Sequence, residues 1–300
     1  MGVKNMEYTF EQKLELAKKV RVRIGSVTIP EHYEAYLDKV EVKECYLKTR
    51  HDQTHYYKIQ SKNKKSEAPL IMNIHGGGFC KGYEKVDTVF SSMLAVETGA
   101  VVLDLDYKLS PEYPFPVAYE EGYDLAKWAY GNAEDLGIDK SKIILCGHSS
   151  GGNIASAIAM ESVKTKDFEV KFQILDYPPM DLYTDPADKP EASKSYVPFE
   201  IVRAYNALYT ATKEETKNPY VSPVFATQDM LQGLPDALVI TAGLDALHNE
   251  AEKYAFMMME AGVKVTIKKY PNSNHGFVIR YIGDEWPKAH KLIVETINQL

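Results

Sequence analysis

The sequence predicts an α/β protein whose mostly parallel sheet is covered by helices on both faces. Short apolar runs alternate along the chain with segments of helical length, as in strand–helix–strand units. The runs that we interpret as strands are Leu70–Ile74, Ala100–Leu105, Lys142–Cys146, Lys171–Leu175, Ala237–Thr241 and Val263–Ile267. Because these runs are continuously apolar, they suit strands that are buried on both faces of a parallel sheet. The expected helices are Thr88–Glu97, Val117–Tyr130, Gly152–Ser162, Asn249–Ala261 and Trp286–Asn298.

Two further elements precede this alternation. Thr9 and Gln12 have capping-box spacing, so an amphipathic helix is expected to begin there. Its apolar stripe consists of Phe10, Leu14, Ala17 and Val20. Val40–Leu47 and Thr54–Gln60 then have the composition of two strands of a hairpin, joined by a turn at His51–Gln53. Together with the runs above, the hairpin gives an expected sheet of eight strands.

The chain is expected to form one domain, residues 1–300, with an inserted lid. Its 300 residues and its hydrophobic content of 45% are enough for one large core. Residues 177–223 interrupt the strand–helix alternation. This segment begins rich in Pro, Asp and Lys and then carries Phe199, Tyr205 and Tyr209 at near-helical spacing. An insertion of this length is usually functional and is often a lid.

The composition argues against several classes of function. The formal net charge is -7, from 35 Lys+Arg against 42 Asp+Glu, so no overall basic field exists to bind nucleic acid. Three cysteines without CxxC spacing argue against a disulfide framework and a zinc site. The first ten residues hold no signal-peptide run, and no stretch approaches the roughly 18 apolar residues of a membrane span. We therefore expect a cytoplasmic protein without a nucleic-acid or membrane partner.

The strongest local signal is the pentapeptide Gly147–Gly151, with the sequence GHSSG. It follows an apolar run and precedes a helix-like stretch, which is the context that a nucleophile elbow requires. Glycines at both ends suit a tight turn that leaves no room for side chains. The turn would lift the Ser149 hydroxyl clear of the sheet edge. The helix that follows has a positive N-terminus, so the backbone N–H of Ser150 is an expected oxyanion donor.

A second motif, residues 75–79 with the sequence HGGGF, follows the expected strand Leu70–Ile74. A loop in this position can supply the other half of an oxyanion hole. Consecutive glycines let backbone N–H groups point at an oxyanion without obstruction, so Gly76 and Gly77 are the expected donors. A phosphate-binding loop is disfavoured, because the run has neither the Gly-Lys-Ser/Thr of a Walker loop nor the spacing of a dinucleotide loop.

A serine nucleophile needs a histidine base and a carboxylate that orients it. In the chain order typical of this elbow, the acid and then the base follow the serine, which leaves His248, His275 and His290. We predict His275, because it lies in a polar loop after the last expected strand, whereas the other two fall at or inside helices. Asp245 follows the strand Ala237–Thr241 at its carboxyl end, and we predict it as the acid. Weaker alternatives inside the expected lid are Asp181, Asp185 and Asp188.

Other conspicuous residues are interpreted as structural. His51 and His55 flank a turn rather than a helix, which disfavours a metal pair. Met257–Met259 is expected to fill the core against the sheet. Cys80 and Cys146 lie beside the two motifs and are expected to be packed small residues, with a reactive thiol as the minor alternative. We expect neither a metal nor a cofactor.

With these residues, the chain resembles the hormone-sensitive lipase family of bacterial carboxylesterases over about residues 69–278. Besides the two glycine motifs, residues 106–116 (DYKLSPEYPFP) are similar to a family segment that contains Ala-Pro-Glu and Pro-Phe-Pro. Residues 245–250 (DALHNE) resemble the family motif DPLRDE. The stretches 218–223 and 233–235 match the family in the same order.

The resemblance implies an α/β-hydrolase fold with a helical cap formed by about residues 1–38 and 177–223. The implied roles are Ser149 as nucleophile, Asp245 as acid, His275 as base, and Gly76, Gly77 and Ser150 as oxyanion donors. Two departures concern the nucleophile and the acid. His148 and Ser150 stand where the family commonly has Asp and Ala, and Ala246 replaces a proline. We expect catalysis to survive with altered specificity, and His148 to point away from Ser149 and to pack or hydrogen-bond.

The expected function is hydrolysis of short-chain acyl esters, acetyl to butyryl, through an acyl-enzyme on Ser149. The expected partner is a small-molecule ester, and a homodimer is left open. Two alternatives remain. A non-catalytic small-ligand receptor on the same fold is disfavoured because all three triad residues are present. A peptidase or amidase differs only in the bond cleaved, since the same triad can act on amides.

Overall fold

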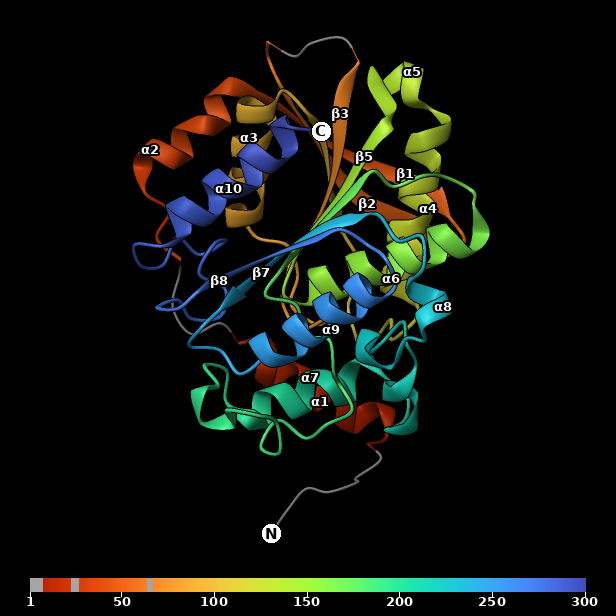
Figure 1. Ribbon diagram of the computed structural model, residues 1–300, viewed down its shortest axis with the longest axis vertical. Coiled ribbons are helices and arrows are strands. Elements are labelled where there is room, and N and C mark those ends of the chain that lie inside the picture. The colour runs from red at the N-terminus through yellow and green to blue at the C-terminus, as the bar shows by residue number, and fades with distance from the viewer. Residues whose placement is uncertain (1–7, 23–26, 64–66) are drawn as a thin grey trace.

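The computed structural model describes residues 8–22, 27–63 and 67–300 and confirms the α/β-hydrolase fold, with helices on both faces of a central sheet (Figure 1). The sheet has eight strands in the order β1-β2-β4-β3-β5-β6-β7-β8. Strand β2 is antiparallel to both of its neighbours, and the remaining pairs are parallel. The strands are β1 (Val40–Thr49), β2 (Asp52–Ser61), β3 (Ala68–Ile74), β4 (Val101–Asp106), β5 (Ile138–His148), β6 (Phe172–Asp176), β7 (Asp236–Ala242) and β8 (Val265–Tyr270).

Two helical layers bury the faces of this sheet. One layer contains α4 (Val117–Gly131), α6 (Ser150–Thr165) and α9 (His248–Glu260), and the other contains α3 (Lys85–Thr98) and α10 (Trp286–Asn298). Residues of β3 and β4 point alternately into the two resulting cores. The central strands are therefore apolar on both sides, which explains their continuous apolar runs. The shorter helices are α2 (Glu31–Glu34), α5 (Ala133–Leu136), α8 (Gln228–Leu231) and the 3₁₀ turns Ala35–Lys39, Ala192–Lys194, Glu214–Lys217 and Pro223–Phe225.

A separate pair of helices lies beyond the carboxyl ends of the parallel strands. Helix α1 (Phe10–Arg21) has the expected capping box at Thr9 and packs against α7 (Phe199–Tyr209). Figure 1 shows the two side by side, apart from the layers that flank the sheet. We call α1 and α7, with the loops of residues 177–198 and 210–223, the α1–α7 layer.

Part of the predicted cap range lies elsewhere. Helix α2 and the 3₁₀ turn after it, residues 31–39, pack against α3 on a flank of the sheet. Their aromatic side chains Tyr33 and Tyr36 join the core on that face. Residues 1–7 and 23–26 of the predicted cap range are outside the described residues.

Several predicted boundaries are wrong by a few residues; strand β5, for example, begins at Ile138 rather than at Lys142. The hairpin turn is Arg50–His51 rather than His51–Gln53, because Asp52 already pairs with Thr49 in the ladder. Strand β8 extends to Tyr270, three residues beyond the predicted end. It is an edge strand with the exposed residues Lys268 and Lys269, so an apolar run underestimates its length.

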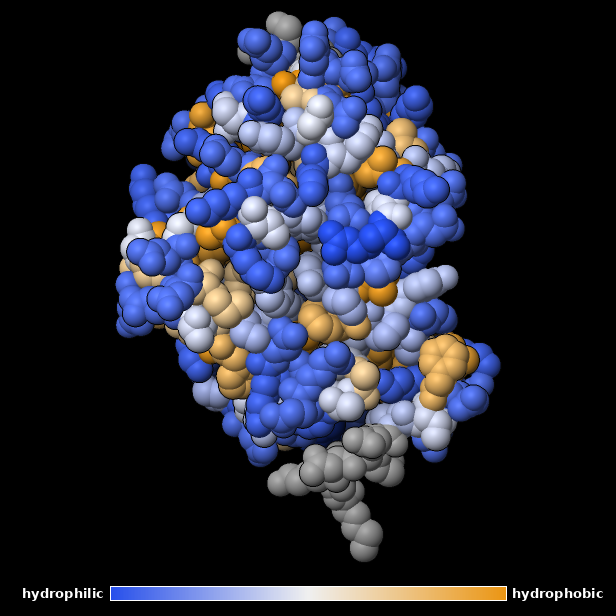
Figure 2. Space-filling model, turned by 90° about the vertical axis from the view of Figure 1, so that its right-hand side faces the viewer, coloured by the Kyte–Doolittle hydropathy of each residue, from blue (hydrophilic) through white to orange (hydrophobic). Residues whose placement is uncertain are grey.

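The face of the molecule drawn in Figure 2 is mainly polar, with hydrophilic side chains predominating and apolar ones scattered among them. Within the described part of the chain, we find no helix with the length and apolarity needed to cross a bilayer.

Candidate active site

A sharp turn between β5 and α6 carries Ser149. Its backbone has φ 52° and ψ −122°, a strained conformation for a residue with a side chain. A Cβ on Gly147 would lie 2.2 Å from the carbonyl oxygen of Gly151, and a Cβ on Gly151 would lie 2.0 Å from that of Ile74. Both glycines of the motif are therefore needed for space. Gly147 is needed because the turn folds back on itself, and Gly151 because the turn packs directly on β3.

The three residues predicted as a triad form one hydrogen-bonded chain. His275 Nε2 lies 2.8 Å from Ser149 Oγ, and His275 Nδ1 lies 2.7 Å from Asp245 Oδ2. Asp245 is buried in the turn that follows β7, and the N–H of Leu247 donates to its other oxygen at 3.2 Å. Ser149 and His275 are partly exposed. The hydrogen-bonded chain thus begins at a buried carboxylate and ends at the partly exposed residue Ser149.

The HGGGF motif lies beside Ser149, in a segment that we call the glycine loop, residues 75–82. A Cβ on Gly76 would come within 3.3 Å of the Ser149 Cβ, so this loop approaches the serine closely. Gly77 has φ 128°, and a Cβ there would lie 2.6 Å from the Lys81 carbonyl oxygen. The loop therefore needs glycine at Gly77 and leaves little room for a side chain at Gly76, whose backbone lies close to Ser149. Ser150, the third predicted donor, is the first residue of α6.

Two side chains without a predicted role hold the start of the glycine loop. The buried His75 has its Nδ1 2.7 Å from the Gly76 carbonyl oxygen. Since a carbonyl only accepts, Nδ1 carries the proton. Tyr107 stacks on this imidazole with ring centroids 4.2 Å apart and donates from its hydroxyl to the His75 carbonyl at 3.2 Å. The sequence motif around Tyr107 pointed to a family, but only the fold places its ring beneath the loop.

His148, next to Ser149 in the sequence, points away from it as expected. Its Nδ1 lies 2.8 Å from Asp176 Oδ2, and both side chains are fully buried. The ring of Phe90 covers the imidazole edge-on. Burial raises the pKa of Asp176, and the hydrogen bond from His148 counteracts this rise. His148 and Asp176 also face each other in the β5–β6 ladder, a register that the sequence alone does not reveal.

The weaker candidates for acid and base are engaged elsewhere. Asp185 pairs with Arg203, whose hydrogen bonds lower the carboxyl pKa to about 2. Asp181 accepts from two N–H groups of its own turn, and Asp188 is an exposed residue of the same loop. His248 binds Glu191 at 2.6 Å, and His290 binds Glu97 at 2.9 Å.

The two buried cysteines and the histidines His51 and His55 are also explained by structural roles. Burial raises the pKa of Cys80 to about 12 and that of Cys146 well above its usual value, so both remain thiols and the reactive-thiol alternative loses support. His51 binds Glu120 and His55 binds Asp106. Across residues 8–22, 27–63 and 67–300, no group of three His, Cys, Asp or Glu residues is arranged to hold a metal ion.

Known proteins are similar to this chain in sequence. A family profile described as alpha/beta hydrolase fold matches residues 71–279. An arylesterase of Saccharolobus solfataricus is 32% identical over 225 residues, which cover 74% of this chain and 72% of that protein. The carboxylesterase NlhH of Mycobacterium tuberculosis is 30% identical over 217 residues, 70% of this chain and 66% of its own.

The same relationship holds in three dimensions. The hyperthermophilic esterase from the archaeon Pyrobaculum calidifontis superposes with a TM-score of 0.82 at 29% identity, covering 98% of this chain and 99% of that one. The chain therefore belongs to the α/β-hydrolase family of enzymes, in the hormone-sensitive-lipase-like group that its motifs predicted.

Proposed function

We propose that this protein is a carboxylesterase that hydrolyses short-chain acyl esters through an acyl-enzyme on Ser149. The observation that carries the proposal is the chain Ser149–His275–Asp245, with contacts of 2.8 and 2.7 Å, next to the glycine loop. A nucleophile, a base and an orienting acid are the parts that acyl transfer requires. The esterases among the relatives support the same chemistry.

The reaction begins with attack of Ser149 Oγ on the ester carbonyl carbon, while the hydroxyl proton moves to His275 Nε2. The resulting oxyanion is stabilised by the backbone N–H groups of Gly76, Gly77 and Ser150. The C–O bond to the alcohol then breaks, and His275 returns the proton to the leaving oxygen. In the second half, His275 deprotonates a water molecule, which attacks the acyl carbon and releases the acid and free Ser149.

Asp245 determines which nitrogen of His275 can act as the base. Its carboxylate accepts a hydrogen bond from Nδ1 at 2.7 Å, so in the resting state Nε2 has a free lone pair toward Ser149. The buried carboxylate also stabilises the imidazolium that forms after proton transfer. Asp245 therefore orients the base without exchanging the proton itself.

For substrate size, we propose acetyl to butyryl esters and a cap that limits the acyl chain. We assign this cap to the α1–α7 layer, with residues 31–38 left in the flanking helical layer where they pack. The aromatic residues of α7 support a modest pocket, since the ring of Tyr205 lies directly above Gly78 in the glycine loop.

The cellular setting is also a proposal. The cytoplasm fits the free thiols of Cys45, Cys80 and Cys146, because cytosolic proteins keep their cysteines reduced. The partner that we propose is a small-molecule ester.

The test is hydrolysis of p-nitrophenyl esters from acetate to palmitate by the wild type and by folded Ser149→Ala. We expect the highest kcat/KM between acetate and butyrate, and a loss of roughly 10⁵- to 10⁶-fold in the variant. Higher efficiency on palmitate than on butyrate would refute the proposed chain length. No turnover by the wild type would refute the esterase and favour the receptor.

The amidase alternative is separated by a matched pair of substrates. An ester and an anilide with the same acyl group and a similar leaving group are compared at equal enzyme concentration. We expect the ester to be hydrolysed far faster. Comparable kcat/KM values on both would instead identify an amidase with incidental esterase activity.

A further inference from the structure

The glycine loop rests on the α1–α7 layer rather than on the central core alone. The clearest contact is at Gly78, which has φ +61°. A Cβ on this residue would lie 2.4 Å from two ring carbons of Tyr205. The ring of this α7 residue therefore covers the Gly78 backbone, and only glycine fits beneath it.

The next residue of the loop packs on the next turn of α7. The ring of Phe79 stacks on that of Tyr209 with centroids 3.7 Å apart and planes within 9°. Both rings are buried. Tyr205 and Tyr209 are four residues apart and so lie on one face of the helix. One stripe of α7 thus covers two consecutive residues of the glycine loop.

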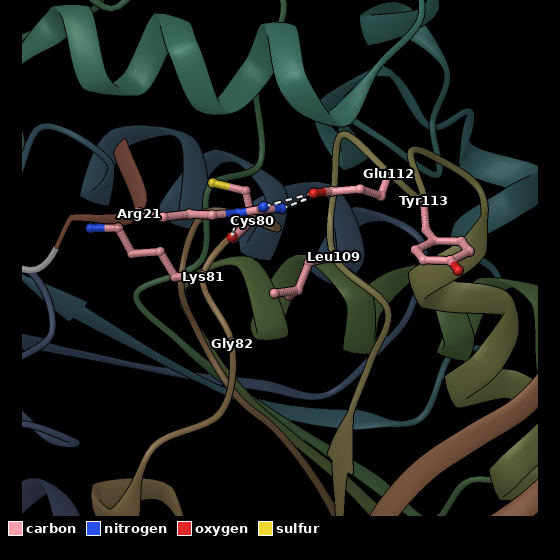
Figure 3. A pocket seen from close by; sticks show the side chains of 7 residues that line it. All are labelled: Arg21, Cys80, Lys81, Gly82, Leu109, Glu112 and Tyr113. Carbon is pink, nitrogen blue, oxygen red and sulfur yellow. Dashed lines mark hydrogen bonds and ion pairs between the residues drawn. The ribbon is translucent and has the colours of Figure 1, made fainter. Parts of the chain in front are cut away.

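The third contact comes from the end of α1. Arg21 Nε donates to the Cys80 carbonyl at 2.8 Å, and its Nη2 donates to the Ser110 carbonyl at 2.8 Å. The same guanidinium forms an ion pair with Glu112 at 2.5 Å, and Figure 3 shows it lying between Cys80 and that carboxylate. The Cys80 side chain is buried in a small apolar cluster with residues of both α1 and α7.

The glycine loop needs this support because of its backbone conformation. Gly77, Gly78 and Phe79 have φ values of 128°, 61° and 64°, and the last is strained for a residue with a side chain. Such backbone persists only where its surroundings over-determine it. Oxyanion donors act by being fixed before the reaction, so a small displacement of the loop would lower the rate.

We propose that Tyr205, Tyr209 and Arg21 are positioning residues that hold the glycine loop in its reactive conformation. The α1–α7 layer then contributes to the chemical step, beyond any control of substrate entry. This inference rests on the proposed esterase function.

The first test compares Tyr205→Ala with Tyr205→Phe, which keeps the ring above Gly78. In the alanine variant we expect kcat/KM for p-nitrophenyl butyrate to fall about 10- to 100-fold. The affinity for a trifluoromethyl ketone, whose adduct with Ser149 carries an oxyanion, should fall by a similar factor. Binding of the intact ester to the same variant on a Ser149→Ala background should be unchanged. The phenylalanine variant should keep values near those of the wild type.

Arg21 gives a second test that does not remove a ring from the interior. Its guanidinium lies on the wall of an open cleft of about 470 Å³. Arg21→Ala should lower the affinity for the trifluoromethyl ketone, and added guanidinium should restore part of it, while equimolar sodium chloride should not. Glu112→Gln keeps both carbonyl contacts of Arg21, so it should lose less affinity for the ketone than Arg21→Ala does.

The outcomes separate the two proposals. A wild type without ester turnover would overturn the proposed function. If the wild type is active but folded Tyr205→Ala and Arg21→Ala keep full ketone affinity and raise only KM, the α1–α7 layer controls entry alone. That result would overturn the positioning role and leave the esterase intact. Thermal unfolding of each variant verifies that the protein is folded.

Discussion

Two aspartate–histidine pairs lie near Ser149, the outer pair His275–Asp245 and the inner pair His148–Asp176. They differ in what surrounds them rather than in their own geometry. The Nδ1–Oδ2 distance is 2.7 Å in His275–Asp245 and 2.8 Å in His148–Asp176. The far nitrogen of His275 lies 2.8 Å from the Ser149 hydroxyl. The far nitrogen of His148 is buried without a hydrogen-bond partner among the described residues.

An acid–histidine pair becomes a base only where its free nitrogen meets a reacting group. The ring of Tyr177 contacts both imidazoles, with centroids 5.0 Å from His275 and 6.2 Å from His148. The two pairs therefore pack against the same aromatic ring. His275 comes from a loop that reaches over the sheet edge, whereas His148 is the last residue of β5 and is fixed inside the sheet.

The largest expected effect is on the base. His275→Ala should lower kcat/KM about 10⁵-fold or more, because a triad loses nearly all of its advantage when one catalytic member is removed. His148→Ala should retain activity within about tenfold once the protein is folded, because His148 lies outside the proposed proton path. Steady-state hydrolysis of p-nitrophenyl acetate measures both. Equal losses in two stable variants would show that the assignment of the base is wrong.

Substitution of the two aspartates tests the same difference between the pairs. Asp245→Asn should lower kcat by about 10⁴-fold, since an amide favours the wrong tautomer of His275. Asp176→Asn preserves shape and should change kcat by less than about tenfold, because His148 gives no proton to the substrate. The measurement is kcat between pH 6 and 9 for both variants. A loss in Asp176→Asn as large as that in Asp245→Asn would mean that the inner pair takes part in the chemistry.

The inner pair should matter for stability instead. His148→Ala leaves a buried carboxylate without its partner, a change that typically costs about 3–5 kcal/mol. The pKa of Asp176, already raised by burial, should rise further when the hydrogen bond is lost. A raised folded-state pKa removes stability as pH increases, so the deficit should be larger at pH 8 than at pH 5. Urea unfolding at the two pH values measures it.

A double variant provides the control for this effect. His148→Ala with Asp176→Asn has no carboxyl at the site. The stability change that His148→Ala causes on the Asp176→Asn background should therefore lack the pH dependence that Asp176 produces. A deficit of His148→Ala that is equal at pH 5 and pH 8 would contradict the role assigned to the Asp176 carboxylate.

The sequence was sufficient for the Ser149–His275–Asp245 triad because each member has a local signature. Ser149 lies in a glycine-bounded turn, and Asp245 and His275 follow apolar strands in the required order. The inner pair has none, since Asp176 ends an apolar run and its partner is set by the register of β5 against β6. The contact of Tyr205 with Gly78 was equally hidden, because it depends on how residues far apart in the chain fold over one loop.

Asp104 is a buried carboxyl without a histidine partner. Its substitution should have the smallest effect on stability. Its partners are Ser91, Tyr83 and Asn73, at 2.6, 2.8 and 3.0 Å. Burial raises its pKa from 3.8 to about 7 despite these bonds. Between pH 4 and 7 the folded protein therefore holds a proton that the unfolded chain has lost. Stability should fall as pH rises across this range, by at most about 4 kcal/mol.

Asp104→Asn should remove this dependence. An asparagine can accept from Ser91 and Tyr83. Its amide can donate to Asn73 Oδ1, which has no partner among the described residues, once the Asn73 amide turns over so that Oδ1 replaces Nδ2. We expect the variant to match the wild type within about 1 kcal/mol at pH 5 and to be the more stable protein at pH 8. Urea unfolding at both pH values measures the difference. A variant that is less stable at pH 8 than at pH 5, by as much as the wild type is, would show that Asp104 ionises normally and that the three hydrogen bonds outweigh its burial.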